Sequence, residues 1–154
     1  MYKAKQPGGF TFTELLVTIA IMLILGALTI STYSQYRIER LLSSEAARLV
    51  ALLESTKASS LAGKGNESQG IKFNASSFET FSGSSYAGGS DIVVFDLDPE
   101  LLISTTLSGD EEIVFSRLTG WANDAATITI AVVDDLSVYK QIEVGTAGEI
   151  HLRE

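Results

Sequence analysis

Residues 8–14 read GGFTFTE, and they separate a short basic segment from a long uncharged one. The only charges before this stretch are two lysines, and the next charge after its final Glu is Arg37. A helix over the 22 uncharged positions 15–36 would extend for roughly 33 Å, about one hydrocarbon thickness of a bilayer. The sequence therefore predicts a helix that can span a membrane, beginning just after the Gly-Gly pair.

Two ordinary kinds of N-terminal segment compete with any more specific interpretation. A secretory signal peptide should carry small residues after its apolar run, whereas here the Gly-Gly pair precedes the run and residues 27–31 form only a weak cleavage site. A plain membrane anchor agrees with Lys3 and Lys5, which would hold the N-terminus in the cytoplasm. It leaves Glu14 unexplained, because a carboxylate costs about 2 to 3 kcal/mol near the bilayer centre and less toward the interface.

A cut after Gly9 would supply Glu14 with a partner. Cleavage there creates a new positive amino group at Phe10. That amine is too close to Glu14 along one helix to be its lasting neighbour, but the amine of an adjacent, axially staggered helix could neutralise the carboxylate.

The N-terminal residues resemble those of a known protein family. Gly9, Phe10, Thr11 and Glu14 together resemble the N-terminal motif of type IV prepilins and type II secretion pseudopilins. The resemblance implies that a membrane prepilin peptidase cuts between Gly9 and Phe10 and methylates the new amine of Phe10. It also implies that Glu14 guides assembly into a helical filament.

The same resemblance implies a location and a set of partners. The chain would sit in the inner membrane as a single-pass protein, with its N-terminus in the cytoplasm and its C-terminal domain periplasmic or extracellular, and would then enter the filament. Its partners would be other pilin or pseudopilin subunits, the prepilin peptidase, an inner-membrane assembly platform and, before assembly, membrane lipid.

Beyond Arg37 the apolar residues follow the period of an amphipathic helix. The stripe consists of Ile38, Leu41, Leu42, Ala46, Leu49, Val50, Leu53 and Leu61. No proline interrupts residues 10–62, and Gly63 and Gly65 are suited to ending a helix. We therefore expect one continuous helix; a sustained coiled coil is the less favoured alternative, because the stretch is only about three heptads long with weak a/d regularity.

After the helix the hydrophobic period changes from 3.6 to 2, which predicts strands. The expected strands are 71–73, 78–81, 92–97, 113–116, 127–133, 138–144 and 149–153, with a mobile surface loop at 82–90. The last three should form an antiparallel meander, because turn residues lie between them at hairpin length. Its buried face should hold Ile128, Ile130, Val132, Ile142, Val144, Ile150 and Leu152.

These patterns predict the class α+β: a long N-terminal helix, membrane-spanning in its first half and amphipathic in its second, packed on a C-terminal antiparallel β-sandwich or sheet. The expected divisions are a leader at 1–9, a transmembrane and filament-core helix at 10–36, an amphipathic helix at 37–62 and a β-rich domain at 63–154. Only one modest domain fits in the roughly 118 residues after the anchor.

A long helix followed only by strands also resembles the minor pseudopilin H and fimbrial T group. That likeness implies a subunit that helps to initiate or cap a type II secretion pseudopilus or a type IV pilus. Two alternatives stay open: a major or minor type IV pilin of surface fibres used in adhesion, motility or DNA uptake, and a plain membrane-anchored β-domain.

Charge and composition argue against other functions. The net charge is −8, and it becomes −10 when Lys3 and Lys5 leave with residues 1–9. Nucleic-acid binding is not expected, because the remaining Lys and Arg are scattered. The chain has no cysteine and therefore no disulfide.

Catalytic and metal sites are not expected either. The single histidine, His151, should face outward from a terminal strand, and no nucleophile motif accompanies it. The acidic runs at 91–100 and 110–112 lack a calcium-loop pattern. No cofactor is predicted. The only tryptophan, Trp121, is expected in the core, with an exposed contact position as the alternative.

Overall fold

Helix α1 runs from Phe12 to Leu61 in the computed structural model, which describes residues 9–153 except for the side chains of residues 27–32 and 34. Both prolines of the chain, Pro7 and Pro99, lie outside α1, so no proline removes one of its helical hydrogen bonds. The helix ends where Gly63 takes a left-handed conformation, with φ of 65°, and donates its N–H to the Ser60 carbonyl at 3.0 Å. A short 3-10 turn, η1 (Lys64–Asn66), then leads into the strands.

The chain divides into two compact units, Met1–Arg37 and Ile38–Glu154, and α1 contributes residues to both. The sequence predicts a membrane span at residues 10–36. Among the described residues, no helix is both long enough and apolar enough to cross a membrane.

The second unit contains two four-stranded antiparallel sheets. One has the strand order β3-β2-β1-β5 and the other β4-β6-β7-β8, so the last three strands form the predicted meander. The strands are β1 (Gln69–Asn74), β2 (Ser77–Ser82), β3 (Ser90–Asp96), β4 (Leu101–Thr105), β5 (Glu112–Phe115), β6 (Ala126–Val132), β7 (Tyr139–Val144) and β8 (Ile150–Arg153).

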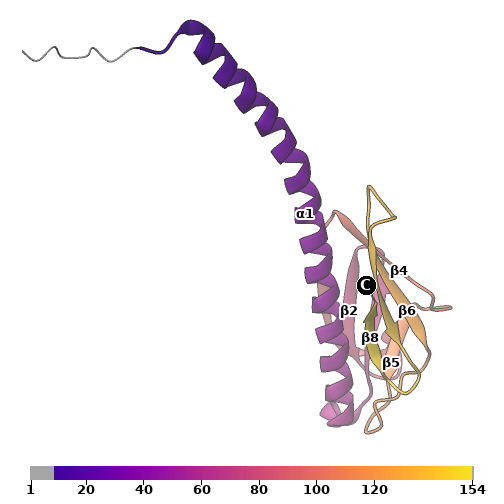
Figure 1. Ribbon diagram of the computed structural model, residues 1–154. Helices are drawn as coiled ribbons and strands as arrows, with labels where there is room; N and C mark the ends of the chain where they lie inside the picture. Colours follow the sequence, from indigo (N-terminus) through magenta and orange to yellow (C-terminus); the bar gives the residue numbers. More distant parts are fainter. Residues whose placement is uncertain (1–8, 154) are drawn as a thin grey trace, which may run out of the picture. The chain divides into compact units, whose positions relative to one another are not determined.

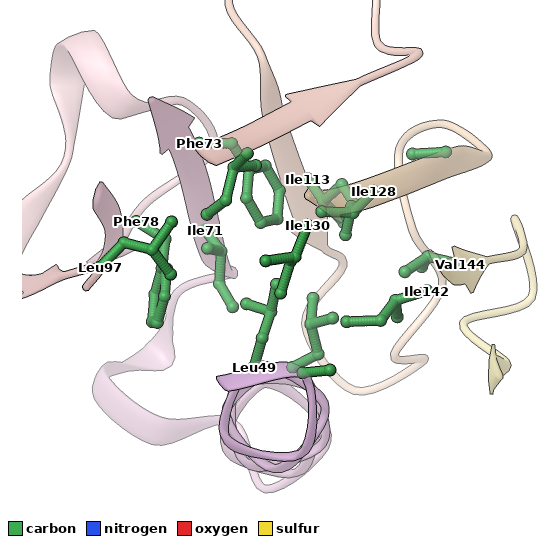
Figure 2. Packing of buried hydrophobic residues seen from close by; sticks show 14 of the residues in the cluster. Leu49, Ile71, Phe73, Phe78, Leu97, Ile113, Ile128, Ile130, Ile142 and Val144 are labelled. Atoms are coloured by element: carbon green, nitrogen blue, oxygen red, sulfur yellow. The ribbon is translucent and has the colours of Figure 1, made fainter. Parts of the chain in front are cut away.

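One hydrophobic core joins both sheets to the second part of α1, which runs beside the strands of this unit (Figure 1). The helix contributes Leu42, Ala46, Leu49 and Leu53, whose spacing of four, three and four residues places them on one face. Figure 2 shows Leu49 at the centre, pointing toward isoleucines from both sheets. These four side chains are at most 2% exposed, and Ile38, Leu41 and Val50 of the predicted stripe are partly buried against the same core, whereas Leu61 at the end of the helix is 43% exposed.

Strand β3 is an edge strand with an unusual surface. Ile92, Val93 and Val94 are 45%, 50% and 55% exposed. A bulge interrupts its pairing with β2 between Thr80 and Ser82, and opposite this bulge Asp91 takes a positive φ of 52°. The edge is thus apolar along its middle and irregular at its start.

The structure differs from the sequence-based expectation in one strand and in the exposure of two side chains. Strand β4 was not expected, although it supplies buried Leu101 and Ile103. Leu152 was expected in the core but is 42% exposed, because β8 is the outermost strand of its sheet. Trp121 was also expected in the core and is 63% exposed, so that expectation was wrong.

The segment 82–90, expected to be a mobile loop, is held in place by Tyr86. This residue lies in a 3-10 turn, η2 (Tyr86–Gly88), and its N–H donates to the Glu112 carboxylate at 2.8 Å. Its hydroxyl donates to the carboxylate of Glu79, and this hydrogen bond raises the pKa of the Tyr86 phenol. The ring also packs edge-on against Phe81, with 5.6 Å between centroids.

Candidate assembly site at the start of helix α1

The residues predicted to carry processing and assembly lie together at the start of α1. Gly9 and Phe10 precede the helix and are exposed, with Phe10 84% accessible, while Glu14 lies in the first helical turn. Residues 1–8 of the predicted leader lie outside the described residues. An exposed, non-helical Gly9–Phe10 bond is accessible to solvent and to other proteins.

Glu14 has a local partner that the sequence-based prediction missed. The Thr11 hydroxyl accepts a hydrogen bond from the Glu14 N–H at 3.3 Å, and the Glu14 carboxylate accepts one from the Thr11 N–H at 3.4 Å. This reciprocal pair is a capping box, which satisfies two of the donors left open at a helix N-terminus. The Thr-x-x-Glu spacing that signals it is visible in the sequence.

The two capping contacts are long for hydrogen bonds between these atoms, which usually span 2.7 to 3.2 Å. They therefore fix the start of α1 without holding the Glu14 carboxylate tightly. A cationic donor from outside the chain would form a shorter and stronger bond with the same oxygen atoms.

The helix that follows Glu14 is apolar on all sides. Its large side chains are 47–73% exposed within this chain, and they are Leu15, Leu16, Val17, Ile19, Ile21, Met22, Leu23, Ile24 and Leu25. A helix that is hydrophobic all round is stable only when lipid or other protein covers it. The first unit therefore presents a surface that requires an environment other than water.

The other candidates from the sequence, the acidic runs and His151, belong to the second unit. Among the described residues, no group of three or more His, Cys, Asp and Glu side chains is arranged to hold a metal ion. His151 is exposed on β8 opposite Glu143, as strand alternation predicts.

Comparisons with known proteins agree with both parts of this description. A family model described as the prokaryotic N-terminal methylation motif matches residues 5–30. The crystal structure of the type IV minor pilin FimU from Pseudomonas aeruginosa superimposes with a TM-score of 0.58 at 16% identity, covering 73% of this chain and 88% of that one. The chain carries this N-terminal motif and has a pilin-like fold.

A second solved structure has the same degree of likeness to this pilin-like chain. The minor pseudopilin EpsH from the type 2 secretion system of Vibrio cholerae gives a TM-score of 0.58 at 10% identity, covering 73% of this chain and 95% of that one. The comparison with curated proteins finds no significant match. The α+β class predicted from the sequence is thus confirmed by the fold, and the predicted resemblance to pilins and pseudopilins is confirmed by the motif together with the fold.

Proposed function

We propose that this chain is a filament subunit that is cleaved between Gly9 and Phe10, methylated at the Phe10 amine, and assembled through Glu14. In this proposal a prepilin peptidase removes residues 1–9. The filament is a type II secretion pseudopilus or a type IV pilus, which the chain helps to initiate or cap. The observation that supports it most directly is the methylation motif, residues 5–30, placed at the exposed start of an all-round apolar helix on a pilin-like fold.

The proposed location follows from the same helix. Before assembly, residues 10–36 would lie in the inner membrane with the N-terminus in the cytoplasm, as the lysines of the leader favour. Residues 37–62 and 63–154 would form the exported globular part, and an inner-membrane platform would deliver the subunit to its neighbours. Fractionation of cell membranes tests this location.

The proposed mechanism is an exchange of partners at Glu14. In the isolated chain the carboxylate accepts the loose bond from the Thr11 N–H. In the filament it would accept a charge-assisted bond from the Phe10 amine of a neighbouring subunit, in surroundings of low dielectric constant where such a pair is strong. The apolar helices, exposed in the single chain, would then cover one another.

The capping role and the charge role of Glu14 can be separated by Glu14→Gln. Glutamine at this position of a capping box can still accept from the Thr11 N–H, but it carries no charge to pair with an amine. We expect Glu14→Gln to be processed normally and to enter filaments as poorly as Glu14→Ala, at least about tenfold below wild type. Thr11→Ala, which removes the hydroxyl cap and keeps the carboxylate, is the matched control and should still assemble. Co-purification with sheared filaments or tip complexes measures incorporation, and wild-type incorporation of Glu14→Gln would refute the charge pairing.

Processing is tested separately from assembly. Gly9→Val should leave the precursor uncut, because the new side chain obstructs the peptide bond to be cleaved. Mass spectrometry of the N-terminal peptide from membranes should find methylated Phe10 as the first residue of the wild-type chain and Met1 in the variant. An intact Met1 in the wild type would mean that the chain is a plain anchored domain.

A further inference from the structure

The surface of the second unit carries an apolar projection that its own core does not use. Leu118 and Trp121 are 61% and 63% exposed, and Leu61, at the end of α1, is 43% exposed beside them. We call these three residues the knob. Exposed tryptophan is rare on monomer surfaces and is enriched at the centres of protein contacts.

The loop that carries the knob is rigid. The Leu118 N–H donates to the Ser60 carbonyl at 3.0 Å, and the Ser116 N–H donates to the Trp121 carbonyl at 2.8 Å. Leu118 itself has a φ of 66°, a conformation that a bulky residue rarely adopts. Backbone strain of this kind persists where the surrounding structure imposes it, and it concentrates at functional positions.

Two cations lie close to the knob in the sequence. Arg117 is exposed and donates to the Asn66 side chain, and Lys64 is exposed in η1. Glu67 is the carboxylate nearest to them in the sequence. The knob is therefore an apolar surface with two cations beside it.

A hollow of about 330 Å³ lies at the other end of the helical segment of this unit. It is lined by Glu39 and Leu42 from α1 and by Val138, Tyr139 and Lys140 from the start of β7 and the turn before it. Leu42 is only 2% exposed and forms an apolar floor, while Tyr139 is 50% exposed. The hollow is large enough for an aromatic side chain.

The β6–β7 turn beside the hollow adds negative charge. The Asp135 carboxylate accepts hydrogen bonds from the Ser137 N–H at 3.0 Å and the Ser137 hydroxyl at 2.6 Å, which fixes the turn. Asp134 and the 63% exposed Leu136 stand next to it. The turn thus adds two carboxylates and an exposed leucine next to a hollow whose own lining holds one carboxylate, Glu39, and one cation, Lys140.

Knob and hollow lie at opposite ends of one rigid body. Leu42 and Leu61 are 19 residues apart in α1, which corresponds to about 28 Å along the helix axis. The two surfaces of one chain therefore cannot meet each other. Each can meet its complement only on another molecule.

We infer that the knob of one chain inserts into the hollow of a second copy, so that the globular units contact head to tail. Arg117 and Lys64 would face Glu39, Asp134 and Asp135 of the other copy, whereas a knob-to-knob contact would bring like charges together. Such a contact uses different surfaces on the two partners, so each bound copy still has one of the two surfaces free. The inference rests on the proposed filament function and gives it a second contact, formed by residues far from Glu14.

Complementary variants of the full-length chain in detergent test this geometry by analytical ultracentrifugation. Trp121→Glu damages the knob and leaves the hollow intact. Ser43→Arg, at an exposed α1 position that lines the hollow, fills it with a cation and leaves the knob intact. Each variant alone should associate at least about tenfold more weakly than wild type. Their mixture should form one-to-one dimers and nothing longer, because it contains one intact pair of surfaces.

The inference would be overturned by a wild-type chain that does not associate, by a variant that associates as wild type does, or by a mixture that stays monomeric. Leu152→Ser, on the exposed edge of β8, is the control and should associate normally. Glu14→Ala distinguishes this contact from the proposed pairing of Glu14. Association that persists in Glu14→Ala supports the knob contact whether or not Glu14 guides assembly, and association lost in that variant places the contact at the start of α1 instead.

Discussion

Gly70 shows how a single residue decides the packing between two strands. It lies opposite Phe81 in the pairing of β1 with β2, and the Phe81 ring occupies the space that a Cβ at Gly70 would need. Phe81 is 1% exposed and has no room to move away. The Phe81 ring therefore packs directly on the backbone of Gly70, which has no side chain in the way.

Gly70→Ala should destabilise the fold by about 1 to 3 kcal/mol, because the added methyl group forces the Phe81 ring out of its packed position. Urea unfolding followed by circular dichroism measures the loss. The matched control is Gly88→Ala, since a Cβ at Gly88 meets only the Ser85 hydroxyl at 3.9 Å. That variant should change stability by no more than about 0.5 kcal/mol, and an equal effect of both substitutions would show that the Phe81 contact is not the cause.

At the level of residues, the candidate site was more predictable than the surface chemistry. Gly9, Phe10 and Glu14 form a local motif, so their spacing in the chain is sufficient to find them. Trp121 follows Gly120 in an irregular loop, where no alternation of polar and apolar residues assigns a side chain to one face. The loop that carries it is held by the Leu118 N–H, which donates to the Ser60 carbonyl of α1, 58 positions earlier, and no local pattern encodes that contact.

Among the elements, the β6–β7 turn is stabilised by hydrogen bonds to the ionised carboxylate of Asp135. Hydrogen bonds from the Ser137 hydroxyl and N–H lower the pKa of Asp135 from its ordinary value of 3.8. A carboxylate with a lowered pKa in the folded state stabilises that state above its unfolded pKa, and this contribution disappears as the pH falls through the folded value.

Asp135→Asn should therefore lower the melting temperature at neutral pH and have progressively less effect as the pH falls below 3.8. Asp134→Asn, at the neighbouring position of the same turn, is the control for the loss of one negative charge. Melting temperatures of the three chains across the acid range provide the measurement. A difference between wild type and Asp135→Asn that stays constant down to the lowest pH would contradict this account of the turn.

The order of elements could be predicted because each has a clear period or clear stop signals. The long helix contains no proline, and the final three strands largely alternate between apolar and polar residues and are separated by turn residues. Strand β4 was missed because its sequence, LLIST, is a short apolar run without alternation. The exposure of Leu152 was missed because alternation assigns a face but does not tell which strand ends at the edge of a sheet.

For the whole molecule, the decisive fact is that α1 and both sheets share one core. Leu49 is fully buried and lies in the same cluster as residues of β1, β5, β6 and β7. Without cysteine, the stability of this unit depends on that core. The second unit should therefore unfold as one body.

Leu49→Ala should destabilise the second unit by about 2 to 5 kcal/mol, because it leaves a cavity between the helix and the two sheets. The unfolding transition should shift as a whole, with far-ultraviolet and near-ultraviolet circular dichroism changing together. Leu136→Ala, at a leucine that is 63% exposed, should leave the transition within about 0.5 kcal/mol of its original position. Loss of one sheet before the other would show that the two do not form one core.

The edge strand β3 affects how easily the chain aggregates. Its bare valines and isoleucine could recruit strands from unrelated molecules, which is how amyloid-like aggregates begin. Asp91, with its left-handed backbone at the bulge, and Asp96, at the far end, make that recruitment harder by geometry and by charge. Salt screens the charge and leaves the geometry unchanged, so in a crowded, saline compartment the bulge is the protection that remains.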